Sequence, residues 1–240
     1  MKRHHVGVLC AGLLAIGLSA TAQAALIDRG NGLIYDDVLD ITWLQDANYA
    51  ATQYVATSGA QGDADGKMSW NAAQTWVGDL DYLGHTNWRL PTIGPLNGST
   101  YNLNLTYNGT TDNTYFGTIF GGGQSATPVT ELGYMFHETL GYLGFYNAWS
   151  GVGSDESSIF GSSLQKDIYW SGSEVSPTEA MFFDMSDGKQ SYYPKAYEYY
   201  AWAVSDGDIS MNPVPVPAAV WLLGSGLMGL LGFGRFRKQS

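Results

Sequence analysis

The sequence predicts an α+β domain, because two segments with helical periodicity are flanked by segments with strand patterns. Apolar residues recur at three- and four-residue steps in residues 70–83 and 131–140, as on one face of a helix. Short apolar runs bounded by turn residues occupy residues 33–44 and 168–204. The stretch of residues 25–208 is long enough for one domain with a sizeable core.

The domain is expected to begin with a β-hairpin. Residues 33–35 and 39–44 have strand patterns, and the pair Asp36-Asp37 supplies a turn between them. A polar, glycine-rich loop is predicted at residues 58–67.

Two helices are expected in the middle of the domain. Ser69 can cap the first helix, residues 70–83, and Gly84 can end it. Thr130 can cap the second helix, residues 131–140. The second helix carries an apolar stripe, which predicts that it faces the core; the stripe consists of Leu132, Met135, Phe136 and Leu140.

An insertion and a β-rich end complete the domain. Residues 94–129 are rich in Asn, Gly, Thr and Tyr, which predicts an inserted hairpin or a long surface loop. Strand patterns follow at residues 168–171, 180–185, 190–193 and 199–204. We expect the second and third of these strands to pair across the turn between them.

The N-terminal segment has the pattern of a secretory signal peptide. Two basic residues precede an apolar stretch at residues 6–18, and small residues then lead to Ala24. This order predicts that residues 1–24 are removed on export. The single cysteine, Cys10, would leave with them.

The C-terminal segment has the pattern of a membrane anchor. A proline-rich linker at residues 209–217 leads into an almost wholly apolar run at residues 216–234, close to the ~20 residues that cross a membrane. A basic tail, residues 235–240, follows at once and is expected to remain in the cytoplasm. Its basic residues are Arg235, Arg237 and Lys238.

The linker contains a motif that resembles a known sorting signal. Its residues are Val214, Pro215, Val216, Pro217 and Ala218, followed by a glycine-rich span and a basic cluster. This order resembles the Val-Pro-x-Pro-Ala variant of the PEP-CTERM sorting tail, although valine stands where the name-giving form has glutamate. The resemblance implies an exosortase-type processing enzyme as a partner. It also implies a precursor anchored in the inner membrane and facing the periplasm, and then a product at the cell surface or in the extracellular matrix.

The charge of the domain restricts its partners. All 22 Asp and Glu residues lie between Asp28 and Asp208, whereas only six of the 11 Lys and Arg residues do, so this stretch has a formal charge of −16. Such a surface repels phosphate backbones and argues against nucleic-acid binding. It favours cations. Asp63 and Asp65, followed by Gly66, form the beginning of a calcium loop, but the later ligands of such a loop are missing, so a plain surface loop is the alternative.

Catalytic motifs are scarce. Only His85 and His137 remain after removal of the signal peptide, and neither a Gly-x-Ser-x-Gly elbow nor a His-Glu-x-x-His helix is present. Neighbouring carboxylates such as Asp36-Asp37, Asp79-x-Asp81 and Asp155-Glu156 would serve a glycosidase only if two of them faced each other in a cleft. We therefore expect a non-catalytic protein and keep an extracellular polysaccharide hydrolase as the alternative.

A cluster of tyrosines near the end of the domain is a candidate binding surface. Alternation along a strand cannot bury all of them on one face, so some are expected to be exposed and able to bind a polysaccharide or surface glycan. The alternative is that they are shared between the core and a protein contact. The residues are Tyr192, Tyr193, Tyr197, Tyr199 and Tyr200.

The domain also resembles a known family. An ordered set of short motifs, among them Thr42-Trp43, Trp88-Arg89-Leu90-Pro91-Thr92, Glu131-Leu132 and Tyr169-Trp170-Ser171, is similar to the Lcl C-terminal domain family. The resemblance covers nearly all of residues 25–208. It implies a C-type-lectin-like scaffold with two main helices packed on twisted, mainly antiparallel sheets. The insertion at residues 94–129 departs from the usual pattern.

These features together predict an exported surface or exopolysaccharide-matrix protein with a ligand-binding or adhesive domain. Trp88, Arg89, Leu90, Pro91 and Thr92 are expected to have a structural role. A purely structural matrix component is a further alternative. No cofactor is expected apart from calcium at Asp63 and Asp65.

Overall fold

The first three strands and the last strand form a four-stranded antiparallel sheet. The computed structural model describes residues 26–115, 127, 129–142 and 159–209. The predicted N-terminal hairpin is confirmed, but its second strand begins later than expected, because the Asp36 carboxylate accepts the N–H groups of Val38 and Leu39 and turns the chain there. In sheet order the strands are β1 (Leu26–Gly30), β2 (Leu33–Asp36), β3 (Ile41–Leu44) and β11 (Val204–Asp206).

Two helices follow, and the first was not predicted. It is α1 (Tyr49–Ala56), and the second is α2 (Trp70–Gly78). The Ser69 hydroxyl accepts the N–H of Ala72, as predicted for a cap. The predicted helix end at residue 83 is wrong, because the chain leaves the helix at Asp79 and Leu83 adopts a left-handed φ of 56°.

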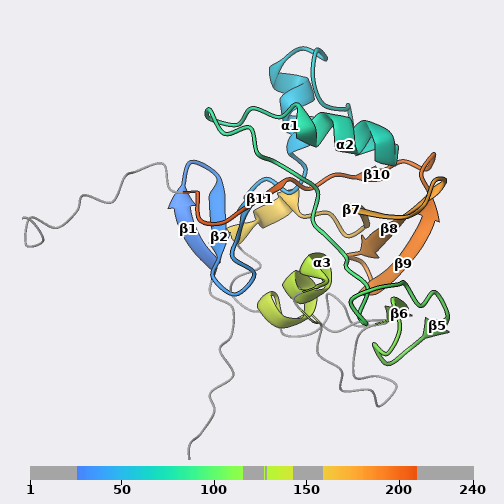
Figure 1. The fold of residues 1–240 in the computed structure, drawn as a ribbon. Coiled ribbons are helices and arrows are strands. Elements are labelled where there is room, and N and C mark those ends of the chain that lie inside the picture. Colours follow the sequence, from blue (N-terminus) through green and yellow to red (C-terminus); the bar gives the residue numbers. More distant parts are fainter. Residues whose placement is uncertain (1–25, 116–126, 128, 143–158, 210–240) are drawn as a thin grey trace, which may run out of the picture.

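The larger sheet has seven strands and contains the predicted β8–β9 hairpin, which is confirmed. All its pairs are antiparallel except β10–β7 and β5–β6. In sheet order the strands are β4 (Lys67–Met68), β10 (Tyr199–Tyr200), β7 (Ile168–Ser176), β8 (Glu179–Asp184), β9 (Lys189–Pro194), β6 (Asn113–Tyr115) and β5 (Leu105–Thr106). Figure 1 shows this sheet beside the smaller one, with α1 and α2 above it.

The strand predicted at residues 199–204 is wrong, because the chain changes sheets within it. β10 ends at Tyr200 and belongs to the larger sheet, whereas β11 begins at Val204 and belongs to the smaller sheet. The residues between them, which include Trp202, are buried and pack in the core rather than pairing in a ladder.

Part of the insertion at residues 94–129 adds strands β5 and β6 to the edge of the larger sheet. These strands are parallel, so they do not form a hairpin with each other. The buried carboxylate of Asp112 organises the loop before them, because its two oxygens accept the N–H groups of Leu96 and Asn102.

The second predicted helix consists of α3 (Glu131–Tyr134) and the π-helical turn η2 (Met135–Thr139). Its predicted apolar stripe is fully buried. Thr130 does not cap the helix as expected, because its hydroxyl donates to the Thr127 carbonyl instead. A short 3-10 turn, η4 (Gly161–Ser163), precedes β7.

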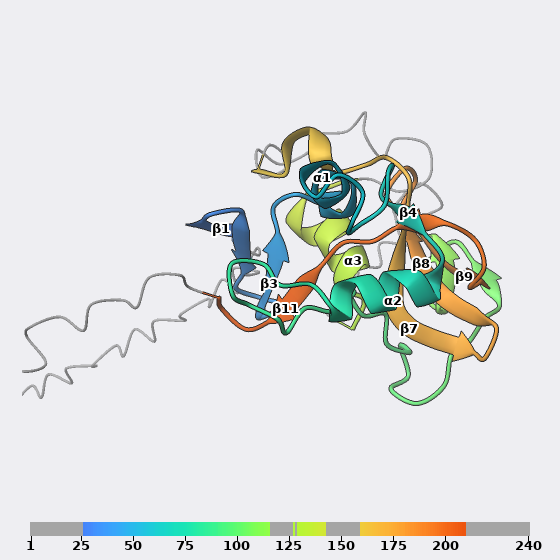
Figure 2. The same cartoon turned by 90° about the horizontal axis from the view of Figure 1, so that it is seen from above.

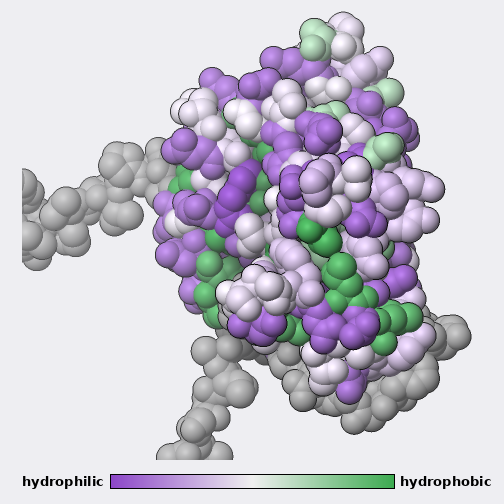
Figure 3. Space-filling model, turned by 45° about the vertical axis from the view of Figure 1, so that its right-hand side comes forward, coloured by the Kyte–Doolittle hydropathy of each residue, from purple (hydrophilic) through white to green (hydrophobic). Residues whose placement is uncertain are grey.

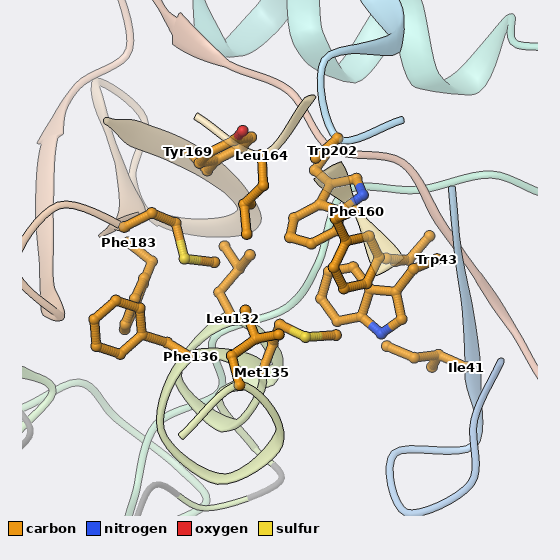
Figure 4. Packing of buried hydrophobic residues seen from close by; sticks show 14 of the residues in the cluster. Ile41, Trp43, Leu132, Met135, Phe136, Phe160, Leu164, Tyr169, Phe183 and Trp202 are labelled. Atoms are coloured by element: carbon orange, nitrogen blue, oxygen red, sulfur yellow. The ribbon is translucent and has the colours of Figure 1, made fainter. Parts of the chain in front are cut away.

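The core lies on both faces of the larger sheet. Alternation along β7 places Tyr169 on the side of α3 and Trp170 on the side of α2. The ring of Trp43 from the smaller sheet lies 4.5 Å from that of Trp202, between centroids, and joins the two sheets (Figure 4). Figure 1 shows α2 above β10 and β7 and α3 below them, and Figure 2 gives the same elements as seen from above. The fold is therefore a mixed α+β arrangement in which helices cover both faces of one sheet.

The predicted terminal features lie outside the described residues. These are the signal peptide, the sorting motif, the apolar span at residues 216–234 and the basic tail. In the part of the chain that the structure describes, no helix has the length and apolarity needed to cross a membrane.

Candidate ligand-binding surface

The five tyrosines that the sequence predicts as a binding surface divide into two groups. Tyr192 and Tyr200 are partly buried and pack against the core on the α3 side of the larger sheet. The ring centroids of Tyr200 and Tyr169 are 5.4 Å apart, and the Lys67 ammonium lies 4.9 Å from the centroid of the Tyr200 ring. These two tyrosines are therefore occupied by packing.

The other three tyrosines form a cluster at the surface, which we call the tyrosine cluster: Tyr193, Tyr197 and Tyr199. The ring centroids of Tyr193 and Tyr197 are 4.5 Å apart, and the rings of Tyr197 and Tyr199 are nearly parallel at 6.3 Å. Tyr193 is 41% exposed and Tyr197 is 50% exposed. Tyr199 continues the cluster inward, because its ring lies 4.7 Å from that of buried Trp170. The two exposed rings thus pack against Tyr199, which in turn packs against the core.

A fixed turn between β9 and β10 positions the tyrosine cluster. The Tyr197 N–H donates to the Pro194 carbonyl, which closes the turn. Within the turn, the Lys195 side chain is buried and its ammonium donates to Glu174 at 2.7 Å. The same ammonium lies 4.3 Å from the centroid of the Trp70 ring. Because Lys195 anchors the turn to two other elements, the tyrosines are held in place before any ligand binds.

A hollow of about 570 Å³ adjoins this turn. Its lining includes Asn71 and Thr178, whose amide and hydroxyl can exchange hydrogen bonds with a polar ligand. The Lys195 ammonium also lines it but is already paired. Figure 3 shows one face of the molecule, on which polar side chains predominate and hydrophobic ones gather in a stripe towards the lower right and in a smaller group at the left.

A second concave site was missed by the sequence reasoning. It is a groove of about 560 Å³ between α1, the following loop and α2, which we call the helix groove. It could not be anticipated, because α1 was not predicted. Its main polar and aromatic lining residues are Gln53, Gln61, Asp63, Asn71, Trp76 and Asp79.

The residues of the predicted calcium loop are occupied by turn hydrogen bonds. Asp63 Oδ1 accepts the N–H of Asp65, and Asp65 Oδ1 accepts the N–H of Lys67. Burial, together with the neighbouring Asp65, raises the pKa of Asp63, whereas the Lys67 N–H lowers the pKa of Asp65. Among the described residues, no group of three or more His, Cys, Asp or Glu side chains could hold a metal ion.

The segment from Trp88 to Thr92 packs partly in the core and hydrogen-bonds to β11 and to β7. Trp88 and Leu90 are buried. The Arg89 guanidinium contacts both Glu131 and Asp206, and the Thr92 N–H donates to Glu131. This segment therefore connects α3 and the smaller sheet.

Of two groups considered for catalysis, Asp36 is buried and His137 is partly buried. Burial lowers the pKa of His137 to about 4, and its ring Nδ1 lies 3.1 Å from the Tyr142 carbonyl oxygen. Burial also raises the pKa of Asp36. The pair Asp155-Glu156 lies outside the described residues. His137 is thus a neutral side chain that packs against the rings of Phe136 and Phe183.

The arrangement of motifs agrees with one comparison. The family model described as the Lcl C-terminal domain matches residues 32–205. This range extends from the first turn of the smaller sheet to β11 and includes the tyrosine cluster and the helix groove. A search of curated proteins finds no match.

Proposed function

The chain belongs to the Lcl C-terminal domain family, and from this premise we propose that it is a non-catalytic, exported surface or exopolysaccharide-matrix protein whose domain binds a glycan. One observation supports glycan binding above the others: the rings of Tyr193 and Tyr197 are about half exposed and lie outside the buried core. Aromatic rings offer flat apolar faces, and their hydroxyls add hydrogen bonds, which together suit the faces of a sugar ring.

The surroundings of the tyrosine cluster favour a neutral glycan. The ammonium of Lys195, which lies in the turn that carries the cluster, is already paired with Glu174, so it offers little to an anionic sugar. The formal charge of −16 on residues 25–208 repels uronates and sulfates further. The C-type-lectin-like scaffold that the family resemblance implies is part of this proposal, and it supports glycan binding by analogy only.

The destination of the protein is a separate part of the proposal. The basic and apolar N-terminal residues support export, and the Val214–Ala218 motif with its apolar span and basic cluster supports sorting by an exosortase-type enzyme. The protein would then reach the cell surface or the matrix, where it could meet polysaccharide.

A glycan-binding screen tests the proposal. The full chain in detergent is compared with Tyr193→Ala and Tyr197→Ala on neutral, acidic and basic oligosaccharides. The control is Tyr107→Ala, which removes a tyrosine of similar exposure, 43%, at another site. We expect each cluster variant to raise the Kd for a neutral oligosaccharide at least tenfold, which corresponds to about 1.4 kcal/mol.

Two results would contradict the proposal. Equal affinity in all four proteins would place the binding site elsewhere, and no binding to any glycan would favour a protein contact or a purely structural matrix role. Mass analysis of the bound oligosaccharides distinguishes the hydrolase alternative, because a hydrolase would shorten them.

A further inference from the structure

The helix groove has the size of a small-molecule site and does not touch the tyrosine cluster. Its volume of about 560 Å³ lies within the usual range for ligand pockets. It is formed by α1, residues 60–63 and one face of α2, and none of the three clustered tyrosines lines it. The groove shares Asn71 with the hollow beside the β9–β10 turn, but its other lining residues do not line that hollow.

The aromatic part of the groove is fixed by a chain of side-chain hydrogen bonds. The Trp76 indole N–H donates to Gln53 Oε1 at 2.8 Å. Gln53 is buried, and its amide N–H₂ donates in turn to Gln61 Oε1 at 3.0 Å. The Trp76 ring, which is only partly buried, is thus held in one orientation. A fixed indole beside oriented amides is suited to a polyhydroxylated ring, which offers both C–H faces and hydroxyl groups.

The charge of the groove has one sign. Asp63 lies on the loop side and Asp79 at the C-terminal end of α2, and the described residues that line the groove include no Lys, Arg or His. Lys67, which follows the loop, does not line the groove and is paired with Asp167 at 2.5 Å. An anionic ligand would meet two carboxylates without a compensating cation. A ligand with an ammonium group would be attracted by both carboxylates and could lie against the indole.

From these observations we propose that the helix groove binds an amino sugar with a free, protonated amine. The ring of the sugar would stack on Trp76, its ammonium would face Asp63 and Asp79, and its hydroxyls would contact the amides of Gln61 and Asn71. N-acetylation removes the positive charge and adds bulk, so an acetylated sugar should bind more weakly.

Calorimetric titration of the full chain in detergent tests this proposal with three defined probes. They are a glucosamine tetramer, its fully N-acetylated form, and putrescine as an amine without a sugar ring. We expect the glucosamine tetramer to bind at least tenfold more tightly than either of the others, and we expect added salt to weaken it.

Matched variants locate the site. Asp63→Asn and Asp79→Asn keep the size of each side chain and should each weaken glucosamine binding at least threefold. Asp81→Asn is the control, because Asp81 is exposed, does not line the groove and, as asparagine, can still accept the Gly84 N–H. Tyr197→Ala should leave this binding unchanged, which separates the groove from the tyrosine cluster.

Several outcomes would overturn the proposal. Equal affinity for the free and acetylated tetramers would remove the role of the amine, and tighter binding of putrescine would remove the role of the sugar ring. Unchanged binding in a folded Asp63→Asn/Asp79→Asn double variant, or no binding at all in the wild type, would show that the groove is not the site.

Discussion

Arg89 donates from both terminal guanidinium nitrogens to the carboxylate of Glu131, at 2.8 Å each. The Glu131 side chain is 9% exposed and accepts a further hydrogen bond from the Thr92 N–H. Arg89 also contacts Asp206 on β11. One arginine thus connects the segment after α2, helix α3 and the smaller sheet.

Removing this arginine should destabilise the fold strongly. Arg89→Ala leaves the Glu131 carboxylate buried without its partner, which costs about 3–5 kcal/mol of the free energy of unfolding. The control is Arg29→Ala, because the pair of Arg29 and Asp208 is more exposed and is worth no more than about 1 kcal/mol. Urea denaturation measures both. Equal losses in the two variants would contradict a special role for the Arg89–Glu131 pair.

Trp88 is buried in the core, and we expect its side chain to contribute strongly to the free energy of unfolding. It is 4% exposed, its indole N–H donates to the His85 carbonyl, and its ring meets the Tyr82 ring edge to face. Trp88→Ala should lower the free energy of unfolding by about 3–5 kcal/mol through the cavity it leaves. Val55→Ala, at a position 76% exposed, should change it by less than about 0.5 kcal/mol. Wild-type stability of the Trp88 variant would refute the expectation.

The sequence predicted those elements of the fold whose signals are local. The β8–β9 hairpin and the start of α2 follow from turn residues and a cap that lie next to them. Helix α1 was missed because only Ala50 and Gln53 are buried in it, too few to produce an apolar stripe. The end of α2 was placed too late, because Leu80 and Leu83 continue the helical spacing although the chain has already turned.

The candidate sites depend on contacts between distant segments, which the sequence does not reveal. Alternation indicated that some tyrosines would be exposed, but the pairing of Tyr199 with Met68 on β4 decides where the exposed group stands. The helix groove depends on the hydrogen bond between Trp76 and Gln53, 23 residues apart and on two different helices. Neither the tryptophan nor the glutamine belongs to a sequence pattern that would predict this hydrogen bond.

Calcium provides a test of the Asp63–Asp65 loop. Both carboxylates already accept turn hydrogen bonds, and two side chains supply fewer oxygens than the six to eight that calcium takes. We therefore expect calcium to shift the unfolding midpoint equally in the wild type and in Asp63→Asn/Asp65→Asn. Specific binding at this loop would instead stabilise only the wild type, by about 2.7 kcal/mol at a hundred times the Kd. A shift confined to the wild type would thus identify a calcium site.

Processing tests the proposed destination. Export predicts the loss of residues 1–24, and the sorting motif predicts a later cut near Pro217. Intact-mass measurement of the protein from its native cells should show both losses. Pro217→Ala should retain the C-terminal span, whereas Pro177→Ala, outside the motif, should be processed normally. If every native molecule still carried residues 216–234, the second cut would be refuted.

The β8–β9 turn should make stability depend on pH. Burial, together with the neighbouring Asp184, raises the pKa of Asp187 to about 6, so the folded state holds this proton more tightly than the unfolded chain, whose aspartates titrate near 4. The stabilisation of the folded state by protonated Asp187 is fully present below about pH 4 and is lost as the pH rises to about 6.

Asp187→Asn removes this effect and can still accept the Lys189 N–H. At pH 7 it should raise the free energy of unfolding by about 1 kcal/mol, a value reduced from the full shift because the side chain is partly exposed to solvent. At pH 4 the gain should disappear. Other carboxylates titrate in both proteins, so the difference between them isolates Asp187, and Glu198→Gln at an exposed position serves as the control. Unfolding curves at pH 4, 5, 6 and 7 measure the difference; a constant value across this range would show that Asp187 titrates alike in the folded and unfolded chains.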